Sequence, residues 1–547
     1  MADEFGPDNT SSDHEAMLPY WQMVETIMAG AGAMRSAGTT YLPQFPRESA
    51  ANYELRRVHA KFTNIYRDIV ENLAAKPFTQ KVTVKADTAS TLIAGDENTS
   101  GLIDDIDGMG NHLHVFAANL FQYGINDAIS WVLVEFTRAT PRPDGRPLSI
   151  ADERAQNLRP YWVHVPAPRM LAVYSDVVDG REIFTHCRIQ ESNVQRDGYK
   201  EVVVHRIREF DRERIVTVNE AGAEKISYGP AVFRLWESKA SADGKSSQWE
   251  IVDSGPVTIG VIPIVPYLVG RRMEGSWRVL PPMQDAAYLQ VEHYQQENEL
   301  RNIRQLTGFP MLAANGVDLR DPANPSATLT VPVGPSSVLC APPSSDGSHG
   351  EWKFIEPSAT SLKFLADNIK ITENQLRELG RQPLTAQTGN LTVVTTAFAA
   401  QKGNSAIQAW AINLKDALEQ AFVLTCKWLN DSTSKPVVVI DTDFDVEIED
   451  SAAPQILMSM RSKGDLSQRT LWSEAKRRGY LSADFDPDAE VEELARENEG
   501  IEPEQPIDPR TGRPIAPDPV VAQDGSADQP DGNADDQNTD QMDEAAA

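Results

Sequence analysis

The order of elements over residues 281–430 constrains the fold of this chain more than any other feature of its sequence. A polar helix is expected at about 281–306 and a second helix at about 358–380, separated by a long excursion of turns and short strands. A short uncharged segment, 382–394, then leads into one long amphipathic helix that ends near residue 430. Two helices around an excursion, followed by a flexible segment and a long helix, suit a channel wall better than an enzyme active site.

The composition limits what the chain can be. Its 547 residues exceed the size at which single hydrophobic cores stop growing, so several compact units are expected. No apolar run approaches the roughly 20 residues that cross a bilayer, and no signal peptide opens the chain, so no membrane partner is expected. Three dispersed cysteines, Cys187, Cys340 and Cys426, argue against a disulfide framework or zinc site and for a reducing compartment. A formal charge of −29 excludes a protein that clamps nucleic acid tightly, because such a clamp needs basic surface.

The pattern before residue 281 predicts an α+β fold. The first 19 residues are polar and are expected to be loose. Helices are predicted at 20–34, 48–75 and 100–129, and strands at 79–85, 131–137, 161–166, 183–189, 201–208, 231–237 and 257–267. Gly124 is expected to close the third helix. The strands after residue 160 form a largely antiparallel region between helical ones.

After residue 430 the sequence predicts a strand and further helices, and then a polar, acidic tail. Residues 435–449 are expected to form one more strand or hairpin, and 453–498 a second helical section. From residue 500 onward large apolar residues are almost missing, so this tail cannot bury enough surface to fold. Residues 501–547 hold twelve acids and two arginines, which is −10 of the net charge of −29.

Residues 104–114 are the strongest catalytic candidate, and their pattern is incomplete. The three aspartates within 104–107 match the start of a calcium loop, but the other ligands and the closing Glu are missing. His112 and His114 are two residues apart on a predicted helix, so their side chains point in different directions. The chain has no Walker A, GxSxG or HExxH motif. We therefore expect no catalytic, cofactor-binding or metal-binding residues, and a hydrolase or nuclease centred on 104–114 stays open as an alternative.

Helix 358–380 carries a row of cations beside its apolar face. Lys363, Lys370 and Arg377 are each seven residues apart, and seven residues return to nearly the same side of an α-helix. The row is either an ordinary solvated face or a ladder of phosphate contacts along a channel.

The polarity of helix 281–306 and the length of helix 395–430 each allow a prediction. Helix 281–306 is polar over most of its circumference, so we expect it to bridge solvent or to pack in a ring with water on its exposed side. The helix at 395–430 would span roughly 50 Å at 1.5 Å per residue, a length that suggests packing by neighbouring subunits.

Three stretches of the sequence together resemble the portal proteins of tailed bacteriophages, in the portal-like branch long catalogued as a domain of unknown function. They are AGAGAMR at 29–35 with YLP at 41–43; PPMQDAA at 281–287 with HYQ at 293–295, GFP at 308–310 and Gly316; and EPS at 356–358 with Leu379-Gly380. Their order and spacing carry the resemblance, and the order of elements extends it over about residues 20–495.

The resemblance implies a ring-forming, portal-type fold with named parts. These parts are a flexible N-terminus (1–19), a wing of helices and mainly antiparallel strands (20–280), stem helix 1 (281–306), a clip (307–357), stem helix 2 (358–380), a tunnel loop (381–394), a long helix with a returning wing strand (395–450), crown helices (451–499) and a disordered acidic tail (500–547).

The resemblance also implies a function and partners. Such proteins form a ring, commonly of twelve subunits, at one capsid vertex, through which double-stranded DNA is packaged and ejected. The implied partners are the major capsid protein, the terminase large subunit and then a tail or adaptor protein, first in the host cytoplasm and finally in the virion. The implied DNA contacts are Lys363, Lys370 and Arg377 on stem helix 2 and Gln387, Thr388 and Asn390 in the tunnel loop. A head–tail adaptor or scaffold-type structural protein is the nearest alternative.

Overall fold

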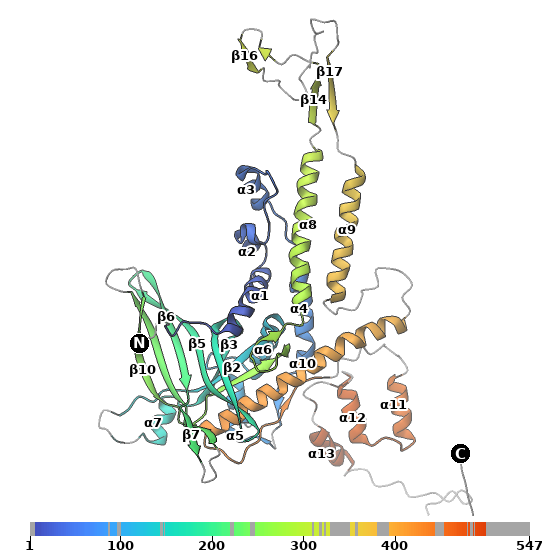
Figure 1. Ribbon diagram of the computed structural model, residues 1–547. Coiled ribbons are helices and arrows are strands. Elements are labelled where there is room, and N and C mark those ends of the chain that lie inside the picture. The colour runs from blue at the N-terminus through green and yellow to red at the C-terminus, as the bar shows by residue number, and fades with distance from the viewer. Residues whose placement is uncertain are drawn as a thin grey trace, which may run out of the picture. The chain divides into compact units, whose positions relative to one another are not determined.

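A computed structural model describes most of the chain (Figure 1). The described residues are 6–85, 88–95, 100–142, 146, 148–218, 224–240, 247–308, 311–316, 320–321, 324–328, 350–355, 359–379, 393–442, 453–477, 480–481, 485 and 487–498. They belong to two compact units, Met1–Ser451 and Ala452–Ala547. The tail at 500–547 and most of the segment 381–394, with Gln387, Thr388 and Asn390, lie outside the described residues.

The first unit mixes helices and strands. Its helices are α1 (Ser12–Ala29), α2 (Ala31–Ser36), α3 (Ala50–Val58), α4 (Ile65–Ala75), α5 (Thr91–Ala94), α6 (Leu113–Asp127), α7 (Ile150–Ala155), α8 (Gln284–Gly308), α9 (Ala359–Leu379) and α10 (Val393–Trp428). Its strands are β1 (Thr83–Val84), β2 (Ile129–Phe136), β3 (Pro160–Pro166), β4 (Met170–Val178), β5 (Arg181–Asp197), β6 (Lys200–Asp211), β7 (Arg214–Val218), β8 (Glu224–Tyr228), β9 (Val232–Ala240), β10 (Ser247–Pro256), β11 (Ile264–Leu268), β12 (Arg271–Arg272), β13 (Val279–Leu280), β14 (Met311–Asn315), β15 (Arg320–Asp321), β16 (Asn324–Thr328), β17 (Glu351–Ile355) and β18 (Val438–Val439). The second unit contains α11 (Ala453–Ser462), α12 (Gln468–Arg477) and α13 (Pro487–Asn498).

Two antiparallel sheets form the β region, as expected. One has the strand order β10-β9-β6-β5-β4 and the other the order β11-β2-β3. Six strands before α8, namely β4, β7, β8, β10, β12 and β13, were not predicted, and β5 and β6 extend beyond the predicted bounds. The extra residues 190–197 of β5 pair with residues 200–207 of β6 in a long hairpin, where little is buried and the hydrophobic pattern is weak.

The core of the first unit lies around β2. Residues 129–134 are all buried, and α6 and α10 both pack against this strand. The prediction that Gly124 closes α6 was wrong, because the helix continues to Asp127. Gly124 is instead required by packing: a Cβ atom there would lie 2.2 Å from the ring of Tyr267.

The N-terminal helices differ from the prediction in three places. The helix expected at 20–34 is broken at Gly30 into α1 and α2. The first helix begins at Ser12 rather than near residue 20, with Ser11 as its N-cap and Pro19 inside it. Because proline usually interrupts a helix, the sequence pattern hid this beginning. The single helix expected at 48–75 is two helices, α3 and α4, with residues 59–64 between them.

Two of the predicted strands are much shorter in the structure. Of the strand expected at 79–85 only Thr83–Val84 is a strand, and of 435–449 only Val438–Val439 is one among the described residues. The two pair with each other as β1 and β18. A few residues of pairing are enough to return the chain from the end of α10 to the region of α4 and α6.

The long helix α10 packs on its own chain. From Ile407 onward it buries an apolar stripe against β2, β11 and α6. The indole of Trp162 donates to Thr425 Oγ1 at 2.9 Å, and the indole of Trp428 donates to Val134 O at 3.0 Å. The length of α10 therefore does not by itself require neighbouring subunits, contrary to the expectation from sequence.

Candidate functional site

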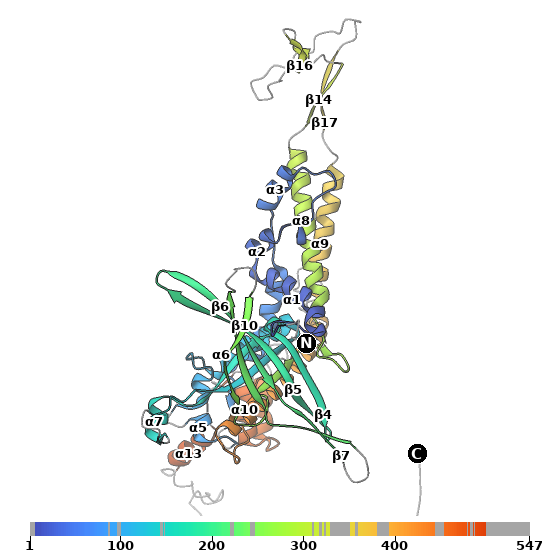
Figure 2. The same ribbon diagram turned by 60° about the vertical axis from the view of Figure 1, so that its left-hand side comes forward.

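Helices α8 and α9 pair side by side and antiparallel (Figures 1 and 2). Ile369 and Leu376 of α9 are buried, and Thr372 Oγ1 donates to Gln296 Oε1 of α8 at 2.9 Å. One turn before Gln296 in α8, His293 Nε2 lies 3.3 Å from Glu373 Oε1. The helices at the two ends of the excursion are thus joined by apolar and polar contacts.

The polar side chains of α8 bind other parts of the same chain. Gln290 is fully buried, and its Oε1 accepts hydrogen bonds from the backbone N–H groups of Ile65 and Tyr66, each at 2.9 Å. Its Nε2 donates to Thr63 O at 3.0 Å. The expectation of a solvent-bridging or water-facing α8 was wrong for these residues, because the chain's own N-terminal segment covers them.

Two further residues of α8 hold the same segment. Asn298 accepts from the backbone N–H of Lys61 at 2.8 Å and donates to its carbonyl at 2.9 Å. Glu297 accepts from Thr63 Oγ1 and Lys61 Nζ, both at 2.8 Å. These bonds take up backbone groups of residues 61–66 that a continuous helix would need, so they explain why α3 and α4 are separate.

The predicted row of cations is not uniform in the structure. Lys363 and Lys370 are exposed on α9, and neither has an ion pair among the described residues. Arg377 is different, because its Nη1 lies 3.3 Å from Asp68 Oδ2 of α4. The end of the row at Arg377 thus ties α9 to α4, and Lys363 and Lys370 remain available to a phosphate.

Sequence reasoning missed a second group of cations near Lys370. A hollow of about 610 Å³ between α8 and α9 is lined by Lys61, Arg301, Arg304 and Lys370, together with Glu297 and Glu373. Both acids already have partners, Lys61 and Thr63 for Glu297 and His293 for Glu373. The spacing of Arg301 and Arg304 on one side of a helix was the available signal, but Lys61 is far away in sequence.

The aspartates at 104–107 have structural roles. Asp105 pairs with Arg159, and Asp104 accepts from the N–H of Gly101 at 3.0 Å. Asp107 accepts from the backbone N–H of Met109 at 2.9 Å. The side chains stabilise the turn that leads into α6.

The two histidines are engaged in the same region. His112 is the N-cap of α6, and its Nδ1 accepts from the N–H of His114 at 2.9 Å. His114 Nδ1 accepts from the N–H of Val82 at 3.2 Å. Burial, followed by the charge of Lys81, lowers the pKa of both imidazoles. The described residues include no group of three or more His, Cys, Asp or Glu placed to hold a metal ion.

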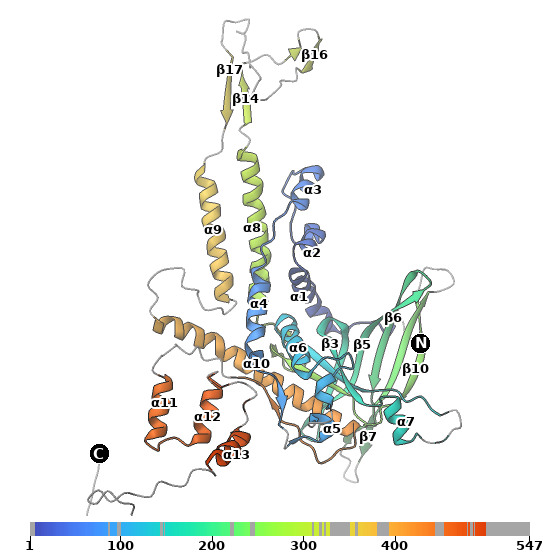
Figure 3. The ribbon, with the colours of Figure 1, turned by 180° about the vertical axis from the view of Figure 1, so that it is seen from behind.

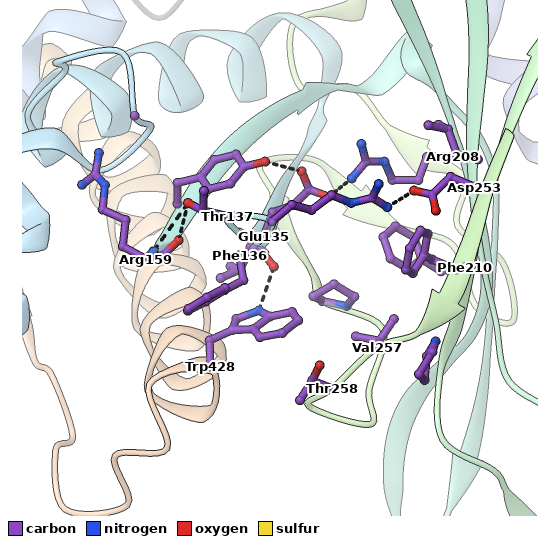
Figure 4. Close-up of a pocket in the computed structure, with 18 of the residues that line it drawn as sticks. Glu135, Phe136, Thr137, Arg159, Arg208, Phe210, Asp253, Val257, Thr258 and Trp428 are labelled. Carbon is purple, nitrogen blue, oxygen red and sulfur yellow. Dashed lines mark hydrogen bonds and ion pairs between the residues drawn. The ribbon is translucent and has the colours of Figure 1, made fainter. Parts of the chain in front are cut away.

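A cavity with a defined lining lies between the two sheets (Figure 4). Its volume is about 730 Å³. Arg208 pairs with Glu135 and Arg138 with Asp253, so its charges are matched within the chain. Tyr161 donates to Glu135 Oε2 at 2.8 Å. The described residues that line the cavity include no histidine or cysteine, and the arrangement offers no nucleophile with a base beside it.

Burial shifts the pKa values of two residues at or beside this cavity, Arg208 and Glu191. It lowers the pKa of Arg208 to about 10 and raises that of Glu191 to about 7. Arg208 Nε lies 2.9 Å from Glu191 Oε1. We regard this pair as part of the packing between the sheets, because each charge has an opposite charge against it.

One protein family matches part of the chain. The domain of unknown function DUF4055 matches residues 282–429, from the beginning of α8 to the end of α10. No curated protein matches the chain. None of the helices that the structure describes has both the length and the apolar character of a membrane span.

Several solved structures contain similar chains at low sequence identity. A chain of the virion of the native gene transfer agent (GTA) particle has a TM-score of 0.37 and 11% identity, covering 82% of this chain and 98% of that chain. A chain of the neck of the empty GTA particle, computed with C6 symmetry, has a TM-score of 0.39 and 13% identity with the same coverage. A chain of the neck of the native particle, computed with C12 symmetry, has a TM-score of 0.33 and 12% identity, covering 77% and 89%. TM-scores below 0.5 do not by themselves establish a shared fold.

Proposed function

We propose that this chain is a portal protein, which forms a ring-shaped channel for double-stranded DNA at one vertex of a phage-like capsid. The observation that carries the proposal is the order of elements within the stretch that matches DUF4055. Paired antiparallel helices α8 and α9 bracket an excursion, and a further segment leads into the long helix α10. This order and the three sequence stretches at 29–43, 281–316 and 356–380 support the same family resemblance.

In this proposal α8 and α9 are the stem, and the residues between them are the clip that meets the terminase large subunit and later a tail or adaptor protein. Residues 381–394 are the tunnel loop, α10 is the long helix beside the wing, and α11–α13 are the crown. The major capsid protein surrounds the ring at the vertex. The ring assembles in the host cytoplasm and ends in the virion.

The charge of the chain supports a conduit in which DNA slides. A formal charge of −29 on each copy makes the assembled ring strongly acidic, so the duplex has few places to stick. Lys363 and Lys370 are exposed cations that can contact phosphates without reading the base sequence. Arg377 is a weaker candidate than the sequence suggested, because Asp68 already lies against it.

Deleting residues 382–394 tests the proposal. We expect the shortened protein to form rings but to package or retain less DNA in particles, because the narrowest part of the channel is lost. A same-length Gly/Ser replacement is the matched control, since it separates the loss of the side chains from the loss of chain length. Normal packaging and retention of DNA by the deletion variant would contradict the tunnel-loop assignment.

A further inference from the structure

The hollow between α8 and α9 lies where a face of one helix opposes a face of the other. The lining residues of each helix are three or four positions apart, so they share one side of that helix. They are Glu297, Leu300, Arg301, Arg304 and Gln305 on α8, and Ala366, Ile369, Lys370 and Glu373 on α9. Seen from behind, the two helices again run side by side (Figure 3). The contacts between α8 and α9 therefore fix the width of this hollow of about 610 Å³.

A third segment of the chain contributes Lys61 to the hollow. The side chain of Asn298 binds the backbone of Lys61 twice, accepting from its N–H at 2.8 Å and donating to its carbonyl at 2.9 Å. The ammonium group of Lys61 lies 2.8 Å from Glu297 Oε1. Lys61 is thus held beside α8 before any ligand arrives, so binding does not have to order it.

Positive charge exceeds negative charge in the lining. Glu297 and Lys61 neutralise each other, and Glu373 is the other carboxylate of the hollow. The cations that are left are Arg301, Arg304 and Lys370. Three positive charges against one negative charge leave an excess of two, in a chain whose formal charge is −29. The hollow is therefore suited to an anion, although the chain as a whole repels anions.

Arg301 and Lys370 face this hollow with side chains that are open to solvent. Among the described residues neither side chain has an ion pair or a hydrogen bond. A guanidinium presents N–H groups in a fixed plane that can bind two oxygens of one anion, and an ammonium group adds up to three donors. One of these cations comes from each helix, so an anion between them can be bound from two sides.

We propose that the hollow binds a phosphate group, held by Arg301 and Lys370 with Arg304 and Lys61 beside them. The oxygens of a phosphate point in tetrahedral directions, so they can accept from cations on two different helices. The two oxygens of a carboxylate lie in one plane and suit a single guanidinium better. The site differs from the row of cations predicted on α9 alone, because half of it comes from α8.

The phosphate has two possible sources with the same chemistry. One is the backbone of a DNA duplex, and this source rests on the proposed function, in which α8 and α9 form the stem of a DNA channel. The other is a free phosphate or polyphosphate. The experiments below tell the two sources apart.

Isothermal titration calorimetry with tripolyphosphate tests the site without DNA. The full-length protein is titrated at low ionic strength. The double variant Arg301→Gln with Lys370→Gln is expected to bind at least about tenfold more weakly, because charge-assisted hydrogen bonds are lost. Arg181→Gln with Lys435→Gln removes the same two charges from exposed residues outside the hollow, and it should bind like wild type.

Two results of the titration would overturn the proposal. One is the absence of tripolyphosphate binding by the wild-type protein. The other is an equal loss of affinity in the two double variants, which would show a general effect of charge. The side chains replaced are all exposed, so both double variants are expected to unfold at the same urea concentration as wild type.

A short fluorescent DNA duplex tests the source of the phosphate. Its binding is followed by anisotropy over a range of salt concentrations. Each phosphate contact that is lost should lower the slope of log K against log salt by about 1. A lower slope in the Arg301→Gln, Lys370→Gln variant, but not in the control variant, supports the DNA backbone as the source. An unchanged slope with weakened tripolyphosphate binding supports a free phosphate, and no change in either measurement would overturn the site.

Electron microscopy of the same samples separates this inference from the proposed function. Rings of the wild-type protein that bind neither tripolyphosphate nor the duplex would overturn the phosphate site and leave the portal proposal standing. Binding that depends on Arg301 and Lys370 in a protein that forms no rings would overturn the portal proposal and leave the phosphate site standing.

Discussion

The side chain of Gln290 in α8 caps the N-terminus of α4, although the two are more than 200 residues apart in sequence. The first backbone N–H groups of a helix have no acceptor within the helix, and those of Ile65 and Tyr66 at the beginning of α4 are both bound by Gln290 Oε1. Asn64, the local N-cap, accepts only from the N–H of Arg67. One amide of α8 therefore fixes where α4 begins.

Replacing Gln290 with Leu is expected to destabilise the protein by about 1–3 kcal/mol, because buried N–H groups lose their acceptor. The measurement is the free energy of unfolding in urea. Gln305→Leu is the matched control on the same helix, since Gln305 is exposed, and its effect should stay within about 0.5 kcal/mol. Equal stability of the two variants would mean that the Gln290 bonds contribute little.

Asp127 gives the stability of the protein a dependence on pH. Burial, followed by the charge of Glu25, raises the pKa of its carboxyl group to about 8, although a hydrogen bond from the backbone of Ala167 opposes the shift. Between about pH 4 and pH 8 the folded state therefore holds a proton that the unfolded state has lost. The contribution of Asp127 to stability then falls as the pH rises through this window.

Replacing Asp127 with Asn is expected to remove this dependence, because the amide is neutral at every pH. The stability of the variant relative to wild type should increase from about pH 4 to pH 8, by an amount on the order of a few kcal/mol, and then level off. Urea unfolding at a series of pH values measures it. A constant difference across this range would show that Asp127 is ionised in the folded protein.

At the scale of an element, α6 shows that a glycine can be a packing residue rather than a helix end. Gly124→Ala is expected to destabilise the protein by about 1–3 kcal/mol, since the new Cβ would meet the Tyr267 ring at 2.2 Å. Gly32→Ala in α2 is the matched control, with nothing within 4 Å of the new Cβ. It should stabilise by roughly 0.5–1 kcal/mol, as alanine favours helix. Thermal unfolding of both variants tests the contrast, and a stabilising Gly124→Ala would contradict it.

The sequence predicted the helices of residues 281–430 closely. Those expected at 281–306, 358–380 and 395–430 are present as Gln284–Gly308, Ala359–Leu379 and Val393–Trp428. Each has a long periodic apolar pattern or clear end signals, which are local properties of the chain.

The failures of prediction arise from contacts between distant residues. The break after α3 depends on side chains of α8, more than 200 residues away. The candidate site shows the same limit. The spacing of the cations on α9 could be read from the sequence, but the pairing of Arg377 with Asp68 and the approach of Lys61 to Arg301 could not.

At the scale of the whole molecule, the described contacts make α8 the organising element of residues 281–430. Its polar side binds residues 61–66, its C-terminal half pairs with α9, and α9 is tied to α4 through Arg377. These contacts hold α8 and α9 against residues 61–75 of the same chain.

Negative-stain electron microscopy of the purified full-length protein shows whether the chain assembles into a channel for DNA. We expect closed rings with a central hole wide enough for duplex DNA. Uniform monomers at high protein concentration would contradict this expectation.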